Sequence, residues 1–210
     1  MNIYLIRHGE TEANVMNKEK YTMFTGQYDT SLTQNGEAQA LRLFDKIGHL
    51  RFDRVFSSDL SRAVNTAEII FPKMDIHKTS LLRERSLGVF EGKRLLDIST
   101  KEEYKKFFSD CEYKDFKHSF VTKAPQGESY TDVMKRVKLF FSNINLHDFD
   151  NVAIVSHAIT MKCILKFLLN LSEEETLKLK INNCEPIKLI NEEGIITREE
   201  NQRENSKVFS

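Results

Sequence analysis

Three short apolar runs constrain the fold of this chain most, because each ends in polar residues and two lead directly into helical patterns. The runs span residues 2–6, 54–57 and 151–156, and the helical patterns span 59–70 and begin again near 158. A nearly continuous apolar run is typical of a central parallel strand, which is buried on both faces. Strands alternating with helices predict an α/β fold, here a three-layer α/β/α sandwich with a largely parallel central sheet.

The remaining elements are predicted from caps, turns and periodicity. Thr33 is a typical N-cap residue before an amphipathic pattern that runs to Ile47. Pro72 stops the helical pattern that spans residues 59–70. Further predicted elements are a short third strand at 74–79, a helix at 128–141, and a terminal hairpin of 186–190 with 195–197. The polar tail from Arg198 is expected to fray.

The segment 93–124 differs from the rest of the chain, because lysine and aromatic side chains dominate it. We interpret it as a set of short helices that form a lid. A solvated helical excursion with buried aromatics explains the same composition, and the sequence alone does not choose between them. With this insertion, the length of 210 residues fits one domain spanning 1–210.

Composition and charge exclude several classes of function. The 31 basic and 31 acidic side chains balance to a net charge of zero, whereas nucleic acids and anionic membranes require a basic excess. The three cysteines form no Cys-x-x-Cys pair, so neither a zinc site nor a disulfide framework is expected. With no signal-peptide pattern and no membrane-spanning apolar stretch, we expect a cytoplasmic protein with reduced thiols.

Polar residues that could carry chemistry follow each apolar run. Arg7-His8 ends the first run, Ser57 to Ala63 follows the second, and Ser156-His157-Ala158 follows the third. The carboxyl ends of parallel strands share one edge of a sheet, where such folds bind ligands. We therefore expect two histidines, two arginines and two helix N-termini to converge, and helix N-termini favour phosphate.

Such a cluster suits phosphoryl transfer. A neutral imidazole nitrogen can attack phosphorus and form a covalent phosphohistidine. Arginines hold the phosphoryl oxygens and offset charge in the transition state. The leaving alkoxide needs a proton, and Glu84, which follows the third strand, is the best candidate to supply it.

Taken in order, the motifs resemble the histidine phosphatase superfamily, which includes cofactor-dependent phosphoglycerate mutases and small phosphomonoesterases. The resemblance extends from the N-terminus to about residue 160. It rests on Arg7-His8-Gly9-Glu10-Thr11 with Asn14, Gly26-x-x-Asp29, Leu32-Thr33-x-x-Gly36 with Gln39-Ala40, Ser57 to Ala63 with Thr66-Ala67, Leu82-Arg83-Glu84 with Gly88 and Glu91-Gly92, Pro125-x-Gly127-Glu128-Ser129, and Ser156-His157.

The resemblance implies a role for each matching residue. His8 would be the phosphorylated nucleophile, and Glu84 would protonate the leaving group and later act as base towards water. The phosphoryl group would be clamped by Arg7, Arg62 and His157 and contacted by Asn14, while Thr25 and Gly26 would line the substrate side. Ala158 stands where many relatives have glycine, yet it keeps the backbone N–H that a ligand would use. No metal and no cofactor are expected.

Three functions remain open at this point. A metal-independent phosphatase acting on a small phosphorylated metabolite is favoured, because the His-Tyr-Gly stretch typical of mutases after the catalytic glutamate is missing behind Glu84. A phosphoglycerate mutase-type transfer and a non-catalytic module that binds a phosphorylated ligand are the alternatives.

Glu84 could instead form a surface salt bridge with its arginine neighbours, and Glu91 is a second carboxylate candidate. The terminal hairpin offers an edge for a homodimer.

Overall fold

The computed structural model describes residues 1–18, 22–110, 115–192 and 194–199. Its main sheet has six strands in the order β4-β3-β6-β1-β7-β8. Strands β4, β3, β6 and β1 pair in parallel, and β7 and β8 continue the sheet in antiparallel pairing. The strands are β1 (Asn2–Arg7), β3 (Arg54–Ser58), β4 (Ile76–Thr79), β6 (Asn151–Ser156), β7 (Ile187–Glu192) and β8 (Ile195–Arg198).

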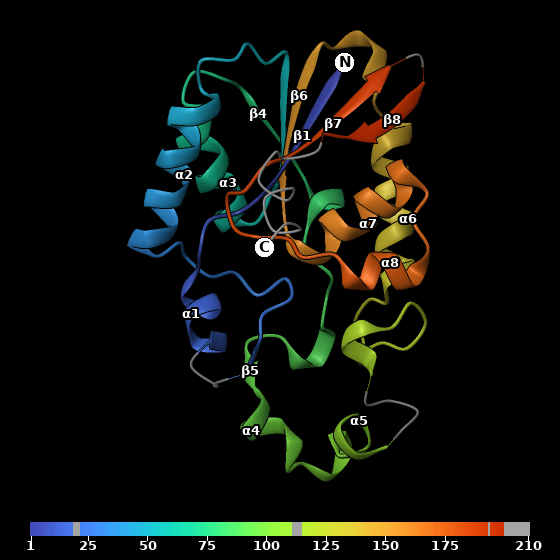
Figure 1. Ribbon diagram of the computed structural model, residues 1–210. Helices are drawn as coiled ribbons and strands as arrows, with labels where there is room; N and C mark the ends of the chain where they lie inside the picture. The colour runs from blue at the N-terminus through green and yellow to red at the C-terminus, as the bar shows by residue number, and fades with distance from the viewer. Residues whose placement is uncertain (19–21, 111–114, 193, 200–210) are drawn as a thin grey trace, which may run out of the picture.

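Helices cover both faces of this sheet, as a three-layer sandwich requires (Figure 1). One face packs against α2 (Gln34–Ile47) and α3 (Ser61–Ile70), and the other against α6 (Tyr130–Ser142) and α7 (Ala158–Leu169), beside which α8 (Glu173–Lys178) lies. The predicted sandwich with a largely parallel sheet is confirmed, including the terminal hairpin. Within the described ranges, no helix is long and apolar enough to cross a membrane.

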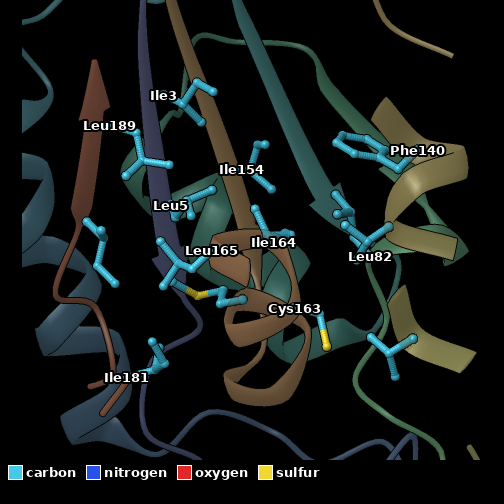
Figure 2. Packing of buried hydrophobic residues seen from close by; sticks show 14 of the residues in the cluster. Ile3, Leu5, Leu82, Phe140, Ile154, Cys163, Ile164, Leu165, Ile181 and Leu189 are labelled. Atoms are coloured by element: carbon cyan, nitrogen blue, oxygen red, sulfur yellow. The ribbon is translucent and has the colours of Figure 1, made fainter. Parts of the chain in front are cut away.

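Strand β1 shows why its sequence is apolar throughout. Ile3 and Leu5 belong to the core on the α6 and α7 side, whereas Tyr4 and Ile6 belong to the core on the α2 and α3 side. Successive side chains of a strand point to opposite faces, so a strand between two helical layers needs apolar residues at every position. Figure 2 shows the first of these cores, which includes Ile3 and Leu5 of β1 together with Ile164 and Leu165 of α7.

Local caps fix the starts of two helices, and the sequence predicts the first of them, Thr33. The Thr33 side chain accepts a hydrogen bond from the Gly36 N–H, which makes Thr33 the N-cap of α2. At the start of α6, Ser129 and Asp132 form a reciprocal capping box. These side chains satisfy backbone donors that the first turn of a helix leaves unpaired, and they fix where each helix begins.

The described part of the segment 93–124 forms short helices that pack on a separate aromatic core, to which Phe24 and Phe90 also contribute. It contains β5 (Lys93–Arg94), α4 (Leu95–Ser99) and α5 (Lys106–Ser109), and β5 pairs with β2 (Met23–Phe24), a short strand that follows α1 (Glu12–Lys18). The buried core residues are Phe24, Phe90, Ile98, Phe107, Phe116 and Ala124. Helices α4 and α5 lie beyond one end of the main sheet (Figure 1). We call residues 93–124 the lid segment.

Candidate active site

The three predicted strand ends meet at one edge of the sheet. Arg7 of β1 is in register with Ser156 of β6, and Ser57 of β3 is in register with Val155. His8 and His157, which directly follow β1 and β6, therefore lie side by side with ring centroids 5.1 Å apart. Arg62 joins them from the first turn of α3.

A cavity of about 200 Å³ opens at this edge. Seven of the predicted site residues line it, while His157 lies fully buried behind His8 and Ala158 is not part of the wall. The lining residues are Arg7, His8, Thr11, Asn14, Asn17, Met23, Thr25, Gly26, Arg62, Glu84, Arg85, Leu87 and Ile159. We call this space the phosphoryl cavity.

The hydrogen bonds of His8 define which ring nitrogen can react. Its Nδ1 lies 2.7 Å from the Gly9 carbonyl oxygen. A carbonyl can only accept, so Nδ1 carries the proton and donates it, and Nε2 keeps a free lone pair. The loop stays close behind the ring because a Cβ on Gly9 would lie 2.5 Å from the Gly36 carbonyl oxygen, so only glycine fits there. The result is a fixed imidazole with an available nucleophilic nitrogen.

His157 has the opposite tautomer. Its Nδ1 accepts a hydrogen bond of 3.3 Å from Nε of Arg62, which can only donate, so the proton of the neutral ring lies on Nε2. This Nε2 is buried and has no hydrogen-bond partner in the described chain. An unpaired buried donor costs about 1–3 kcal/mol, which an oxygen ligand beside His8 would recover.

Burial and positive neighbours keep both imidazoles neutral. Burial holds the pKa of His8 well below its ordinary value, and the cations Arg7 and Arg62 act in the same direction. Burial likewise holds the pKa of His157 well below its ordinary value, again with Arg62 contributing. Histidine is nucleophilic only when neutral, so the environment of His8 preserves its reactive form at neutral pH.

A segment that the sequence analysis did not single out supports the nucleophile from behind. Arg7 donates a hydrogen bond of 2.7 Å to the Ile181 carbonyl, and the Cys184 N–H donates one of 2.9 Å to the Arg7 carbonyl. Asn183 donates from Nδ2 to the His8 carbonyl over 2.7 Å. Residues 181–184 therefore hold both members of the Arg7-His8 pair, although they lie beyond the sequence motifs, which end at about residue 160.

Asn183 also orients a residue of the cavity wall. Its Nδ2 lies 3.4 Å from Oδ1 of Asn14, which also accepts a hydrogen bond from the Thr11 N–H. Because Oδ1 of Asn14 is occupied, the amino group of Asn14 is left to face a ligand. Asn183→Ala should lower kcat/KM by about 10- to 100-fold, since small misplacements of a reacting group have effects of that size.

Steady-state kinetics and thermal unfolding of the variant measure this effect. Asn182→Ala is the matched control, because Asn182 is exposed and its side chain donates to the carboxylate of Glu185, away from the Arg7-His8 pair. Residues acting through one another are non-additive, so the loss should shrink in an Asn14→Ala background. Additive losses in the double variant, or equal rates for the two alanine variants, would contradict a positioning role for Asn183.

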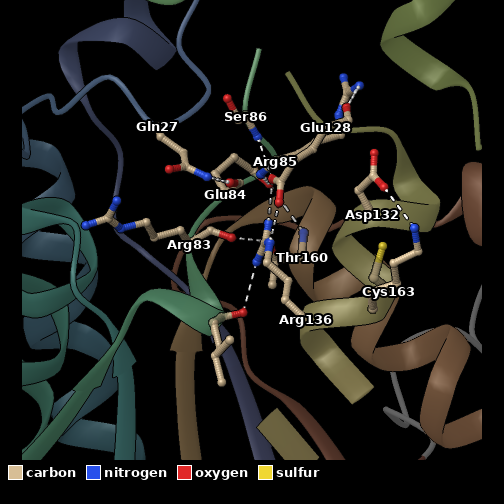
Figure 3. A network of polar contacts seen from close by, with 12 residues as sticks. Gln27, Arg83, Glu84, Arg85, Ser86, Glu128, Asp132, Arg136, Thr160 and Cys163 are labelled. Atoms are coloured by element: carbon tan, nitrogen blue, oxygen red, sulfur yellow. Dashed lines mark hydrogen bonds and ion pairs between the residues drawn. The ribbon is translucent and has the colours of Figure 1, made fainter. Parts of the chain in front are cut away.

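Glu84 faces the cavity and is held by backbone donors. Its carboxylate accepts hydrogen bonds from the N–H groups of Arg85, Ile159 and Thr160, at 2.8, 3.2 and 3.3 Å. The alternative of a salt bridge to its arginine neighbours is wrong, because Arg83 forms a bidentate pair with Asp59 at 2.7 Å, and the side chain of Arg85 donates to backbone carbonyls. Figure 3 shows Glu84 between Arg83, Arg85 and Thr160.

The start of α7 therefore serves a different purpose from the one expected. The sequence predicts that the helix N-termini at this edge favour a phosphate. Two free N–H groups of the first turn of α7 instead bind the Glu84 carboxylate. A carboxylate near a helix N-terminus is favourable for the same reason as a phosphate, because both are anions.

The loop opposite Glu84 is held by Glu91 and Arg62. Oε1 of Glu91 accepts hydrogen bonds from the Gln27 and Leu87 N–H groups. Glu91, the second carboxylate candidate, therefore supports this loop and is not among the residues that line the phosphoryl cavity. Arg62 donates to the carbonyls of Gly26 and Tyr28 at 2.8 and 2.9 Å.

In the described residues, no group of three or more histidine, cysteine, aspartate or glutamate side chains could hold a metal ion.

Comparison with known proteins agrees with this geometry. Residues 3–198 match the family model of the histidine phosphatase superfamily (branch 1). The chain is 31% identical over 188 residues to the protein named "Probable phosphoglycerate mutase GpmB" of Proteus mirabilis, and 32% identical over 192 residues to its namesake in Salmonella arizonae. Each alignment covers 88% of this chain and 82% of the relative.

Solved structures show the same fold. The alpha-ribazole phosphatase of Shigella flexneri superposes with a TM-score of 0.80 at 24% identity, covering 95% of each chain. The phosphoserine phosphatase of Entamoeba histolytica, solved with 3-phosphoglyceric acid, gives a TM-score of 0.73 at 26% identity over 94% of each chain. The family model spans nearly the whole chain, and relatives above 30% identity are matched over most of their length. The chain therefore belongs to branch 1 of the histidine phosphatase superfamily.

Proposed function

We propose that this protein is a metal-independent phosphatase that hydrolyses a small phosphomonoester through a phosphohistidine intermediate. The observation that carries the proposal is the free Nε2 lone pair of His8, fixed by the bond from Nδ1 to the Gly9 carbonyl at the wall of a cationic cavity. Arg7 and Arg62 supply positive charge there, and Glu84 is the one acidic residue among those lining the cavity.

In the first step, Nε2 of His8 attacks phosphorus while the bond from phosphorus to the ester oxygen breaks. Arg7, Arg62 and the Nε2–H of His157 bind the phosphoryl oxygens as negative charge spreads over them. Glu84, protonated at this stage, gives its proton to the departing alcohol oxygen. General acid catalysis of this kind typically contributes about 10²–10⁴-fold.

In the second step, water replaces the alcohol. Glu84, now a carboxylate, takes a proton from the water, whose oxygen attacks phosphorus. The bond between nitrogen and phosphorus breaks, its electron pair returns to Nε2, and inorganic phosphate leaves. Glu84 is then protonated again and His8 is neutral, so the cycle closes without any group beyond the described side chains and water.

Turnover of p-nitrophenyl phosphate before and after exhaustive chelation tests this proposal. We expect release of nitrophenol and phosphate at the same rate in both samples, because the arginines supply the positive charge that phosphoryl transfer needs. A loss of rate that an added divalent ion restores would reject the metal-independent mechanism. Absence of turnover by well-folded protein would favour a module that only binds a phosphorylated ligand.

A mutase is the second candidate, because the curated relatives above carry a phosphoglycerate mutase name. Both functions share the first step and differ in whether water or a phosphorylated alcohol takes the phosphoryl group. The two are separated by incubating the protein with 3-phosphoglycerate. Release of inorganic phosphate identifies the phosphatase, whereas conversion to 2-phosphoglycerate without phosphate release identifies the mutase.

A further inference from the structure

A second cavity adjoins the phosphoryl cavity. It measures about 320 Å³, and none of Arg7, His8, Arg62 and Glu84 lines it. Five residues form walls of both cavities: Asn17, Met23, Arg85, Leu87 and Ile159. The second cavity therefore continues from the reacting centre, on a path open to the alcohol part of a substrate. We call it the leaving-group cavity.

The wall of the leaving-group cavity is largely apolar and has a positive group from the lid segment. Met23, Phe24, Leu87 and Ile159 supply apolar surface, and the lid contributes Lys117 and His118. Nζ of Lys117 lies 4.4 Å from the centre of the Phe24 ring, within the range of a cation–π contact. A ligand with an apolar body can thus pack here with its far end near an ammonium group.

The charge of Lys117 is not neutralised within the described chain. Burial lowers its pKa, and no acidic group there opposes this effect. The pKa of His118 is also lowered, by burial first and then by Lys162, Arg85 and Lys117, with Asp115 alone acting in the opposite direction. A half-buried ammonium without a carboxylate partner is costly unless a ligand supplies the anion.

A buried arginine fixes the backbone that carries Lys117. Arg85 is only 4% exposed, and it donates from Nη2 to the Lys117 carbonyl and from Nη1 to the Phe116 carbonyl, each at 3.0 Å. It also donates to the carbonyl of Glu128, whose carboxylate pairs with Arg136 (Figure 3). The backbone at Lys117 is therefore held in advance, which lowers the entropic cost of placing its side chain against a charged group.

We propose that the leaving-group cavity binds the alcohol part of the substrate, and that Lys117 selects a phosphomonoester whose alcohol has an apolar body ending in a carboxylate or another anion. This inference rests on the proposed phosphatase function. The cavity volume of about 320 Å³ lies within the range of about 300–1,000 Å³ that holds drug-sized ligands. It therefore favours an alcohol larger than glycerate or serine.

Two matched esters test the selection: the phenolic phosphates of 3-(4-hydroxyphenyl)propanoic acid and of its primary amide. They have nearly the same shape and leaving phenol, and they differ in the charge at the far end. The acid should have a kcat/KM at least about tenfold above that of the amide, which corresponds to one charge-assisted hydrogen bond. Phosphoserine, which is shorter, should be hydrolysed less efficiently than the phenolic acid.

Substitution at Lys117 identifies the group responsible. Lys117→Met should bring the acid-to-amide ratio of kcat/KM close to one, and Lys117→Arg should retain the preference for the acid. Lys123→Met is the matched control, because Lys123 is an exposed lid lysine paired with Asp132 at 2.9 Å. It should leave the ratio unchanged.

The outcomes separate this inference from the proposed function. If the wild-type protein hydrolyses both esters equally well, or if Lys117→Met keeps the preference for the acid, the selection by Lys117 is wrong and the phosphatase function stands. If wild-type protein hydrolyses neither ester nor p-nitrophenyl phosphate, the proposed function itself fails and the inference fails with it.

Discussion

Replacing His8 with alanine should reduce turnover of every phosphomonoester by about 10⁴-fold or more, because loss of a covalent nucleophile has effects of this size in other enzymes. The remaining cavity still holds Arg7 and Arg62, so binding of inorganic phosphate should persist while no phosphoenzyme forms. Rapid-quench detection of the phosphoenzyme, together with steady-state rates, measures both effects.

His49→Ala is the control for this variant. His49 is exposed beyond the end of α2 and is not among the residues that line the phosphoryl cavity, so its removal should change neither rate nor phosphoenzyme. Circular dichroism and thermal unfolding should show that His8→Ala remains folded, because the truncation removes one ring and leaves the surrounding strands paired. A folded His8→Ala protein with full activity would show that another group is the nucleophile.

Glu84→Gln should have the second-largest effect, a loss of about 10²–10⁴-fold on an alkyl phosphate. Glutamine has the shape of glutamate and can still accept the backbone N–H bonds through its oxygen, but it cannot donate an acidic proton to the leaving group. A nitrophenolate leaves without protonation, so formation of the phosphoenzyme from p-nitrophenyl phosphate should be much less affected. Hydrolysis still needs a base, and phosphoenzyme should therefore accumulate.

Pre-steady-state kinetics with both esters provides the measurement. The variant should show a burst of nitrophenol followed by slow turnover. Glu102→Gln, at an exposed position of the lid segment, should behave as wild type. Equal losses with the alkyl and the aryl ester would indicate that Glu84 does not act as the acid, and loss of the nitrophenol burst would place its role before phosphoryl transfer.

Local signals explain why much of the fold and site is predictable from the sequence. The apolar run that ends at Arg7 locates β1, and Thr33 marks the start of α2, because both depend on neighbours within a few residues. Parallel pairing then dictates that His8 and His157 share an edge. The positions of β1 and α2 and the meeting of His8 with His157 can therefore be predicted from the sequence, since they follow from short-range patterns and a general rule of sheet topology.

The contacts that sequence reasoning missed join backbone groups far apart in the chain. Asn183 donates a hydrogen bond to the backbone carbonyl of His8. Every residue type has such a carbonyl, so no sequence pattern at His8 predicts this contact. The one available signal was the polar pair Asn182-Asn183 between the apolar residues Ile181 and Cys184. In the same way, the residues around Glu84 could not show that Arg83 pairs with Asp59. That pairing depends on how the loops after β3 and β4 lie relative to each other in the folded chain.

The function of the lid segment also depends on long-range packing. Its aromatic residues predicted burial, and several form the separate core that includes Phe90 and Phe116. The sequence alone did not show that a buried Arg85 would hold the backbone of Lys117 at the wall of a cavity. Two remote segments meet there, so the place of Lys117 at the cavity wall depends on the three-dimensional arrangement and not on a pattern within the lid sequence.

The central claim is that His8 accepts the phosphoryl group, and trapping with an alkaline denaturing quench, using an aryl phosphate radiolabelled in its phosphoryl group, tests it most directly. During turnover, the account predicts label bound to the protein that is released by acid, resists base, and maps to the peptide containing His8. It also predicts no bound label in His8→Ala. Steady turnover by wild-type protein without bound label, or with acid-stable label on a serine such as Ser57 or Ser58, would contradict the account.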